Sequence, residues 1–385
     1  MKFLHLGDLH IGKSLADFDL CEDQKYILSQ ILEIADERKV DGVLLAGDIY
    51  DRSVPGENAV GLLDWFIGEL AGRNLKTFII SGNHDSDERL NFGSRLFARN
   101  QIYISAKYNG ILDRYTFQDA YGTVHLYLMP FIKASQVKKY YPEEEIHSYD
   151  DAVRVVLENS DLNPSERNIL VAHQFVTASD SEPRLAGSEG ASVKNVGTIE
   201  KISASLFDAF DYVALGHIHS PQSIGRDRIR YAGSPLKYSL SEVNHIKSVP
   251  VISLQEKNQV EIELVELKPK RDLRHIKGTM EQLLDKSNIV DADDFIYVTL
   301  TQEEIVDDAI SIFQQIYPNT IKIDYENSHT NEIKQIDFTE MKETRSFPEL
   351  ISDFYNQIYG CEISEEELAL VKSVAKEVDD LYEAD

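Results

Sequence analysis

The chain has 385 residues, enough for two or three domains, and 42% of them are hydrophobic, so it can bury a substantial core. Its formal net charge of −27 excludes a protein that coats DNA non-specifically by itself, unless local charge or a partner protein overrides the total. Asp8 and His10 interrupt the short apolar run at the start, so neither a signal peptide nor a membrane span is expected. We therefore expect a cytoplasmic protein in which Cys21 and Cys361 are unpaired thiols.

The first part of the chain alternates apolar runs with amphipathic stretches. Helices are predicted over residues 22–39 and 58–71, where apolar side chains recur at helical spacing. Five short apolar runs are predicted to be buried strands: Lys2–Leu6, Gly42–Ala46, Thr77–Ile80, Asn168–Ala172 and Asp211–Leu215. This alternation of strands and helices indicates an α/β fold.

The pattern changes at residues 267–272, where we predict a domain boundary. A small α+β domain is expected to follow, with the order strand from Leu273, helix Thr279–Lys286, strand Phe295–Leu300, helix Glu303–Ile316 and strand Thr320–Asp324. Two amphipathic helices come next. One runs from Pro348 to Tyr359, and the other begins with the capping box of Ser364 and Glu367 and continues to about Leu381. The predicted domains are residues 1–267, 268–340 and 341–385.

Each of the five predicted strands ends in polar residues of the kind that bind metals. The segments are Gly7-Asp8-Leu9-His10, Gly47-Asp48, Gly82-Asn83-His84-Asp85, His173-Gln174 and Gly216-His217-Ile218-His219. One Asp or His at a strand end is usually a turn former or a hydrogen-bonded structural residue. Five such ends together favour a site, because ligand sites in α/β sheets gather beyond the carboxyl ends of the strands. The histidines without this context are predicted to be structural: His5, His125, His147, His245, His275 and His329.

The types of side chain in these segments restrict the metal. Carboxylates, imidazoles and a carboxamide occur together without a thiolate, which disfavours a structural zinc site. The set suits Mn²⁺, with Fe²⁺, Zn²⁺ or Mg²⁺ as alternatives. Seven ligands are too many for one catalytic ion with open positions. Two ions about 3.5–4 Å apart that share a bridging carboxylate fit better, as in two-metal phosphoesterases.

The series GDLH, GDIYDR, GNHD, AHQ and GHIH resembles the signature of the calcineurin-like metallophosphoesterases. Three further segments are similar to the SbcD-type DNA nucleases: GDLHIGKSL, HQFV and YAGSPL at residues 231–236. The resemblance covers the whole chain, more loosely after about Glu242. It implies a β-sandwich flanked by helices, a DNA-facing cap domain over residues 268–340 and a C-terminal helix pair over residues 341–385 that docks a partner.

The resemblance also implies a role for each residue of the site. Asp8, His10 and His219 would hold the first metal, and Asn83, His173 and His217 would complete the second. Asp48 would bridge the two ions. His84 would contact the scissile phosphate, and Asp85 would orient His84.

An SbcD-type protein is expected to be a nuclease subunit that uses two Mn²⁺ ions, or Mg²⁺. The resemblance implies an ATP-dependent double-strand 3′–5′ exonuclease and a single-strand or hairpin endonuclease, active in DNA repair, recombination and replication. It further implies a homodimer within a nucleoid-associated heterotetramer with an SbcC-type coiled-coil ATPase, which could supply the phosphate affinity that this acidic chain lacks. The alternatives are a small-molecule phosphodiesterase or phosphatase of the same fold, and a non-catalytic adaptor. The adaptor is disfavoured because every ligand position is occupied.

Several further residues allow two interpretations. Asp51 and Arg52 are predicted only to pin the loop after the second motif. Arg89 is suited either to a phosphate contact or to a surface ion pair. Gly233-Ser234-Pro235 and Gln174 could form turns or contact a DNA backbone, and Arg226–Arg230 could be a DNA-facing patch or a solvated turn.

Overall fold

The structure is a computed structural model that describes residues 1–178, 181–187 and 201–327, with residues 352, 355, 363–364 and 367–369. These residues divide into two units. The first contains Met1–His275, Val290–Tyr297 and Phe313–Lys322, and the second contains Ile276–Ile289, Val298–Ile312 and residues from Ile323 onward.

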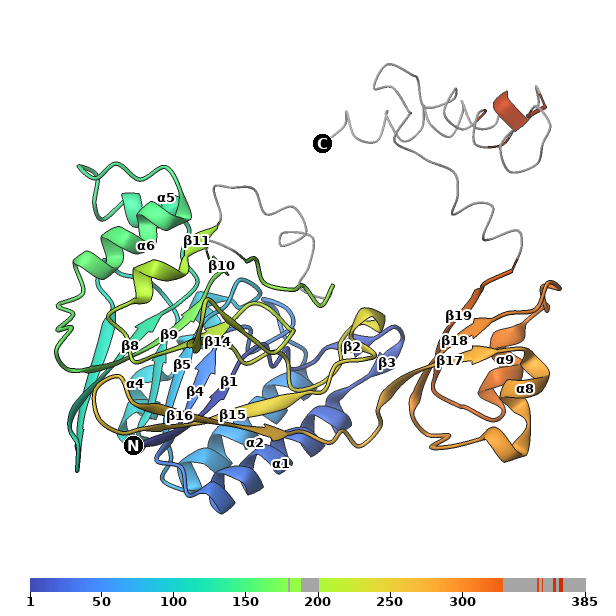
Figure 1. Cartoon of the computed structure of the whole chain (residues 1–385), viewed down its shortest axis with the longest axis horizontal. Coiled ribbons are helices and arrows are strands. Elements are labelled where there is room, and N and C mark those ends of the chain that lie inside the picture. Colours follow the sequence, from blue (N-terminus) through green and yellow to red (C-terminus); the bar gives the residue numbers. More distant parts are fainter. Residues whose placement is uncertain are drawn as a thin grey trace. The chain divides into compact units, whose positions relative to one another are not determined.

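Two six-stranded sheets form the centre of the first unit (Figure 1). The first sheet has the order β16 (Val260–Glu266), β15 (Ser248–Leu254), β1 (Lys2–Leu6), β4 (Gly42–Ala46), β5 (Lys76–Ile80) and β6 (Ile102–Ser105). The second has the order β13 (Gln222–Ile224), β14 (Arg226–Tyr231), β12 (Tyr212–Gly216), β9 (Arg167–His173), β8 (Gly122–Met129) and β7 (Asp113–Asp119). The five predicted strands are therefore confirmed as β1, β4, β5, β9 and β12.

The two sheets pack face to face through alternate residues of their strands. Phe3, Leu44 and Phe78 of the first sheet belong to one buried cluster with Leu126 and Val171 of the second. Because successive side chains of a strand point to opposite faces, the remaining apolar residues face outward and need a second cover. The central strands are consequently apolar along their whole length.

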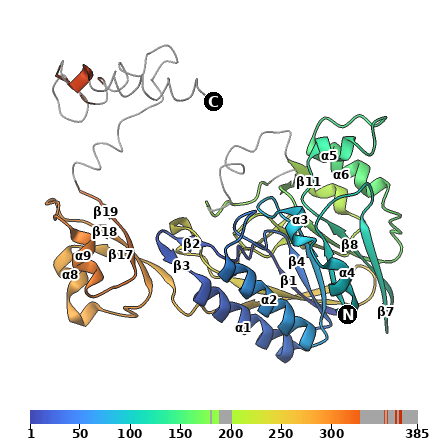
Figure 2. The ribbon, with the colours of Figure 1, turned by 180° about the vertical axis from the view of Figure 1, so that it is seen from behind.

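Helices provide this cover on both sides. On the first sheet, α1 (Cys21–Arg38) and α2 (Glu57–Gly72) pack through residues such as Ile27, Ile31 and Phe66 (Figure 2). On the second, α5 (Ala134–Lys138) and α6 (Tyr149–Glu158) do the same. Shorter elements complete the unit: β2 (Ser14–Leu15), β3 (Phe18–Asp19), α3 (Asp87–Leu90), α4 (Ser94–Phe97), β10 (Val176–Thr177) and β11 (Ile202–Ser203). The predicted β-sandwich flanked by helices is confirmed.

After residue 272 the chain forms a three-stranded sheet in the order β17 (Leu273–Gly278), β18 (Phe295–Leu300) and β19 (Thr320–Tyr325), with α8 (Met280–Leu284) and α9 (Ala309–Gln314) in its connections. The order of elements matches the prediction. The helix expected over Glu303–Ile316 is wrong in extent, because Asp308 has φ of +50°, a left-handed conformation that an α-helix cannot contain. The boundaries at residues 267/268 and 340/341 stay a prediction.

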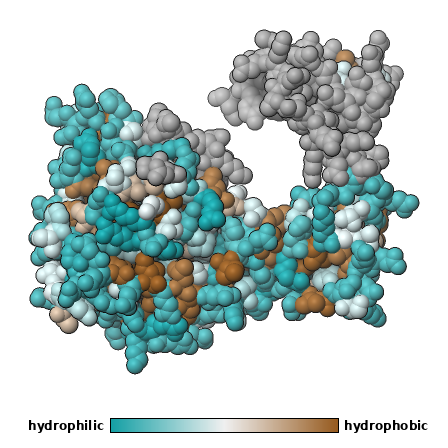
Figure 3. Space-filling model, in the orientation of Figure 1, coloured by the Kyte–Doolittle hydropathy of each residue, from teal (hydrophilic) through white to brown (hydrophobic). Residues whose placement is uncertain are grey.

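The predicted C-terminal helices lie largely outside the described residues. The capping box is present: Ser364 and Glu367 exchange hydrogen bonds, with the Glu367 N–H donating to Ser364 Oγ at 3.3 Å. Within the described ranges, no helix has both the length and the apolar character that crossing a bilayer requires. On the face shown in Figure 3 the surface is mostly hydrophilic, with small and separate apolar patches.

Candidate metal centre

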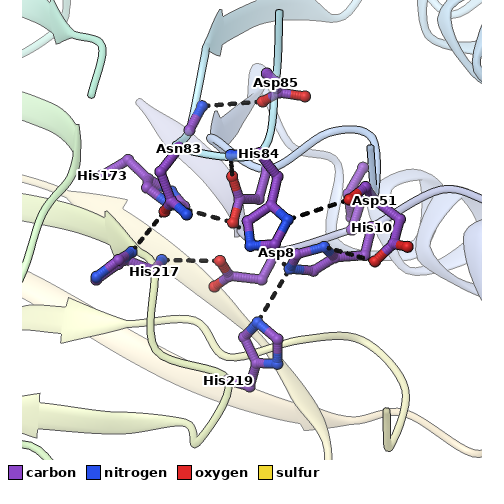
Figure 4. Close-up of polar contacts among 12 residues, drawn as sticks. Asp8, His10, Asp51, Asn83, His84, Asp85, His173, His217 and His219 are labelled. Carbon is purple, nitrogen blue, oxygen red and sulfur yellow. Dashed lines mark hydrogen bonds and ion pairs between the residues drawn. The ribbon is translucent and has the colours of Figure 1, made fainter. Parts of the chain in front are cut away.

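The carboxyl ends of five strands converge at one edge of the sandwich, and the predicted ligands lie there (Figure 4). In the first sheet, β1, β4 and β5 are parallel neighbours, so Asp8 and His10, Asp48, and Asn83 follow three adjacent strand ends. In the second sheet, β9 and β12 are parallel neighbours. They deliver His173, and His217 with His219. The structure thus brings together all seven residues that the sequence pattern singles out.

The backbone at these strand ends is strained. Asp8, His10, Asp48 and His217 have φ values of +53°, +43°, +49° and +94°, a region that residues other than glycine rarely occupy. Hydrogen bonds hold this conformation: the His10 N–H donates to the Asp48 carbonyl at 2.9 Å, and the His217 N–H donates to Asp8 Oδ1 at 2.8 Å. Strain of this kind persists where the surroundings enforce it, and it is typical of functional sites.

Two glycines allow the close approach of the strand ends. A Cβ atom at Gly82 would collide with the Asp48 carboxylate, and one at Gly216 would collide with the carbonyl of Ala46. Only glycine leaves room for the backbone at these positions. Gly82 therefore allows the ends of β4 and β5 to approach within the first sheet, and Gly216 allows the end of β12 to approach β4 of the other sheet.

Two groups of side chains are arranged so that each could hold a metal ion. Asp8, His10 and His219 form one group, and Asp8, Asp48 and His173 form the other. Within the first, His10 Nε2 and His219 Nε2 are 3.0 Å apart. Asp48, a member of the second group, also lies close to the first. Its Oδ2 atom is 3.4 Å from His173 Nε2 and 3.5 Å from His10 Nε2.

Asn83 and His217 extend the second group. The Asn83 Oδ1 atom lies 3.1 Å from His173 Nε2 and 2.8 Å from His217 Nδ1. The other nitrogen of His173, Nδ1, lies 2.7 Å from the carbonyl of Ala46, which can fix the orientation of the ring. Asn83 is only partly buried, unlike the six other residues, so this end of the centre is accessible.

Burial determines most of the protonation states. It lowers the pKa values of His10 and His219, and together with the neighbouring His173 it lowers that of His217 to about 3. For His173 the effect of burial is outweighed by the charge of Asp48 and the hydrogen bond with it, which raise its pKa to about 9. For Asp48 burial opposes ionisation, but the charge of His173 and the hydrogen bond with it dominate and hold its pKa well below the usual range.

These residues fit a pair of divalent ions. Metal binding requires ionised carboxylates and neutral imidazoles, and Asp48, His10, His217 and His219 are already in those states near neutral pH. The donors are oxygen and imidazole nitrogen, which suit Mn²⁺, Fe²⁺ or Zn²⁺.

The structure gives His84 a partner that the sequence did not predict. Its Nδ1 atom lies 3.1 Å from the carbonyl of Asp51, and its ring lies edge-on to His10 with centroids 4.9 Å apart. Its backbone N–H donates to Asp48 Oδ1 at 2.9 Å. His84 is half-buried and lies beside the two metal-binding groups, and its contact with the scissile phosphate stays a prediction.

The predicted contact between Asp85 and the His84 ring is corrected by the structure. The Asp85 carboxylate instead accepts hydrogen bonds from the backbone N–H groups of Ile49, Tyr50 and Gly82, at 2.9–3.0 Å. Burial, followed by the charge of Asp48, raises the pKa of Asp85 to about 6. Asp85 thus fastens the loop after β4 to the loop after β5, and the Asp51 carbonyl takes the orienting position.

Several supporting residues carry no local sequence signal. Gln24 of α1 donates to the carbonyl of His10 at 2.7 Å and to the hydroxyl of Tyr238 at 3.1 Å. Beneath His219, the buried ammonium group of Lys247 donates to the His219 carbonyl at 3.0 Å and pairs with the buried carboxylate of Glu242. These contacts join residues up to 214 positions apart, which a local pattern cannot reveal.

The structure also shows the surroundings of the residues for which the sequence allowed two interpretations. Asp51 does more than pin its loop, since its Oδ1 atom lies 2.7 Å from Lys13 Nζ and 3.4 Å from His10 Nδ1. Ser234 is buried and accepts a hydrogen bond from Lys247 at 2.8 Å, which favours the structural turn. Gln174 is buried and donates to the carbonyl of Ile132.

The basic candidates are exposed or half-buried. Arg226 is exposed and pairs with Asp208 at 2.6 Å, and Arg228 donates to the side chain of Asn258 at 3.1 Å. These pairings favour the solvated hairpin of β13 and β14 over a free basic patch. Arg52 and Arg89 are exposed.

The sandwich and the centre at its strand ends define a calcineurin-like phosphoesterase, and the family model with this description matches residues 1–221. A second model, described as the type 5 capsule protein repressor C-terminal domain, matches residues 269–359. The chain is 36% identical over 331 residues to the SbcD subunit of the nuclease SbcCD from Staphylococcus epidermidis, and the match covers 84% of this chain and 85% of the relative. The chain therefore belongs to the SbcD family of nuclease subunits, and it is a metal-dependent phosphodiesterase.

Two solved structures are similar to parts of the chain. One is a dimetal phosphatase from Danio rerio, at 13% identity and a TM-score of 0.37, with 70% of this chain and 99% of that chain covered. The other is Yfce, a phosphoesterase from E. coli, at 13% identity and a TM-score of 0.27, with 70% and 100% covered. Both TM-scores are low, so the family assignment rests on the sequence matches.

We expect Mn²⁺ binding to release a proton from His173. The metal-free protein holds His173 protonated up to a pH of about 9, whereas a ligand imidazole must be neutral. Apparent Mn²⁺ affinity should therefore rise with pH, by up to about tenfold per unit below about pH 9, and level off above that pH. Titration calorimetry at pH 7.5 in two buffers with different ionisation enthalpies measures the protons released. Equal apparent enthalpies in both buffers would contradict this protonation state.

Proposed function

We propose that the chain is the nuclease subunit of an SbcCD-type complex and hydrolyses DNA phosphodiester bonds with two Mn²⁺ ions. The observation that carries this proposal is the similarity to a nuclease subunit over 84% of the chain, and two groups of buried side chains that could each hold a metal ion support it. The activities would be an ATP-dependent double-strand 3′–5′ exonuclease and a single-strand or hairpin endonuclease, used in DNA repair, recombination and replication in the cytoplasm, at the nucleoid.

The ligand assignments are part of the proposal. Asp8, His10 and His219 would hold one ion and Asn83, His173 and His217 the other, with Asp48 between them. Its position at 3.4–3.5 Å from imidazoles of both groups supports the bridging role. Two divalent ions supply charge that neutralises phosphate oxygens, and they lower the pKa of water to generate the nucleophile.

The protein side chains would position the phosphate. The His84 ring lies beside the metal groups, and its Nδ1 atom would donate to the Asp51 carbonyl. Its other nitrogen, Nε2, would then donate a hydrogen bond to a phosphate oxygen as part of an imidazolium, in which both nitrogens carry a proton. Asp85 would act indirectly, because it holds the loops that carry Asp48 and His84. We therefore assign Asp85 as a positioning residue.

The substrate class can be tested directly. The full-length chain loaded with Mn²⁺ is incubated with linear duplex DNA, hairpin DNA and single-stranded DNA, with and without an SbcC-type ATPase and ATP, and separately with a phosphomonoester such as 4-nitrophenyl phosphate. We expect cleavage of the DNA substrates and slow turnover of the monoester. Efficient monoester hydrolysis without DNA cleavage would instead support the alternative, a small-molecule phosphatase of the same fold.

We also propose that two copies associate within the complex. Residues of α2, α3 and α4 line an apolar cavity of about 720 Å³, and at its edge Phe92 is 84% exposed and Val60 is 47% exposed. An exposed apolar surface of this kind is typical of an interface. Phe92→Glu should shift the chain toward a monomer in sedimentation velocity, whereas Tyr121→Glu, at the turn between β7 and β8, should not. Equal sedimentation of the two variants would argue against this interface.

Two further assignments stay predictions. Residues 268–340 are proposed to face DNA, and residues 341–385 are proposed to dock the coiled-coil ATPase. The apolar stripes that motivate the docking proposal fall largely outside the described residues. The net charge of −27 is consistent with a partner that provides much of the affinity for phosphate. A chain ending near Arg345 should then fold and bind Mn²⁺ but fail to co-purify with the ATPase, and normal co-purification would refute the docking role.

A further inference from the structure

A cavity of about 450 Å³ opens directly beside the metal centre. Asn83 and His217, two of the proposed ligands, form part of its wall, and Phe131, Tyr149 and Lys133 form other parts. A phosphate held by these ligands would place one of its two nucleosides near the mouth of this cavity. The side chains that line the cavity would determine which ligand it binds.

One wall is aromatic and continuous with a proposed ligand. The half-buried ring of Phe131 stacks on the imidazole of His217, with centroids 6.2 Å apart and an interplanar angle of 25°. The buried ring of Phe175 meets the same imidazole edge-on at 6.4 Å. Aromatic faces of this kind bind nucleobases by stacking, with little dependence on which base is present.

The volume of the cavity and the charges that line it further restrict the kind of ligand that it can bind. A volume of about 450 Å³ lies within the range of single small-molecule sites and suits one nucleoside rather than a base pair. The carboxylates of Asp85 and Asp87 also line the cavity, so a second phosphate would be repelled there, whereas an uncharged base would not. Lys133 lies at the cavity wall but is exposed, so it would meet the backbone phosphate that follows the bound base outside the cavity.

We propose that this cavity binds the unpaired base of a nucleotide adjoining the scissile phosphate, with Phe131 as the stacking residue. The inference rests on the proposed nuclease function. It further specifies which form of DNA reaches the metal centre. A paired base would have to leave its partner to enter the cavity, at an energetic cost that is smallest at frayed ends, in hairpin loops and in single strands. The cavity would therefore select unpaired nucleotides without reading their sequence.

The proposal can be tested with single-stranded oligonucleotides that carry one abasic residue. The full-length chain with Mn²⁺ is given an end-labelled oligonucleotide of mixed sequence, either intact or with one tetrahydrofuran abasic residue, and cleavage is measured at every phosphate. The variants are Phe131→Leu, which removes the aromatic face, and Phe131→Tyr, which keeps it. Tyr26→Ala, an exposed residue of α1, serves as a control away from the cavity.

In the wild type, cleavage should fall roughly 5- to 100-fold at the phosphate on one side of the abasic residue, the scale of one lost stacking contact. Phe131→Leu should lower cleavage of the intact strand by a similar factor at all phosphates, with no additional loss at the abasic residue. Phe131→Tyr should retain the additional loss at the abasic residue, and Tyr26→Ala should behave as the wild type does. Bound Mn²⁺ should be unchanged in all variants.

Two results would overturn the inference. Equal cleavage beside the abasic and the intact residue in the wild type would mean that no base occupies the cavity. An equal loss in Phe131→Leu on both strands, together with an undiminished effect of the abasic residue, would make Phe131 a support for His217 only. Failure of the wild type to cleave any phosphodiester would be a different result, because it would refute the proposed nuclease function itself.

Discussion

Asp48→Asn should abolish metal-dependent cleavage, with a loss of at least about 10³-fold. Asp48 is 2% exposed and lies between imidazoles of both metal-binding groups. The substitution keeps the shape of the side chain but removes the negative charge, so two cations would be held close together without the carboxylate that separates and neutralises them. His173 would also lose the charge that raises its pKa. We expect the variant to bind fewer than two Mn²⁺ ions per chain.

The measurements are metal content after gel filtration, cleavage of labelled DNA, and thermal unfolding. Glu33→Gln is a matched control, since it neutralises one exposed carboxylate on α1 without touching the centre. It should retain wild-type activity and metal content. A folded Asp48→Asn protein that holds two Mn²⁺ ions and cleaves DNA within tenfold of the wild-type rate would show that Asp48 does not bridge the metals.

The sequence predicts where the proposed ligands gather, because each of them follows a short apolar run that the structure forms as a buried strand. Parallel strands of one sheet place their carboxyl ends at one edge, so Asp8, Asp48 and Asn83 are brought together by the topology alone. The glycines of the GNHD and GHIH segments mark the close contacts that the structure shows at Gly82 and Gly216. Local pattern and tertiary arrangement agree in this part of the chain.

The contacts that support the ligands could not be predicted in this way. Lys247, Glu242 and Ser234 meet beneath His219 only because β15 returns to the sheet beside β1. Asp85 follows His84 directly, which suggested a pair, yet its carboxylate turns toward the backbone of another loop. The helix expected from Glu303 fails for a local reason, the left-handed conformation of Asp308. Such outcomes depend on backbone geometry, which residue types alone do not determine.

His84→Ala should reduce DNA cleavage roughly 10²- to 10⁴-fold while the metal content stays unchanged. The imidazole is outside both metal-binding groups, and its Nδ1 atom contacts the Asp51 carbonyl. The backbone N–H of residue 84, which donates to Asp48 Oδ1, is retained in alanine. The substitution therefore removes only the side-chain donor. His147→Ala, at an exposed position, is the control and should change neither DNA cleavage nor metal content.

A second substrate shows which oxygen His84 serves. If the imidazole donates to the leaving oxygen, a diester with 4-nitrophenol as leaving group needs little protonation, and the loss in His84→Ala should shrink toward tenfold or less. If it donates to a non-bridging phosphate oxygen, the loss should be similar for this diester and for DNA, because that oxygen gains charge in both reactions. Loss of one Mn²⁺ ion in His84→Ala would contradict both forms of the prediction, since it would make His84 a metal ligand.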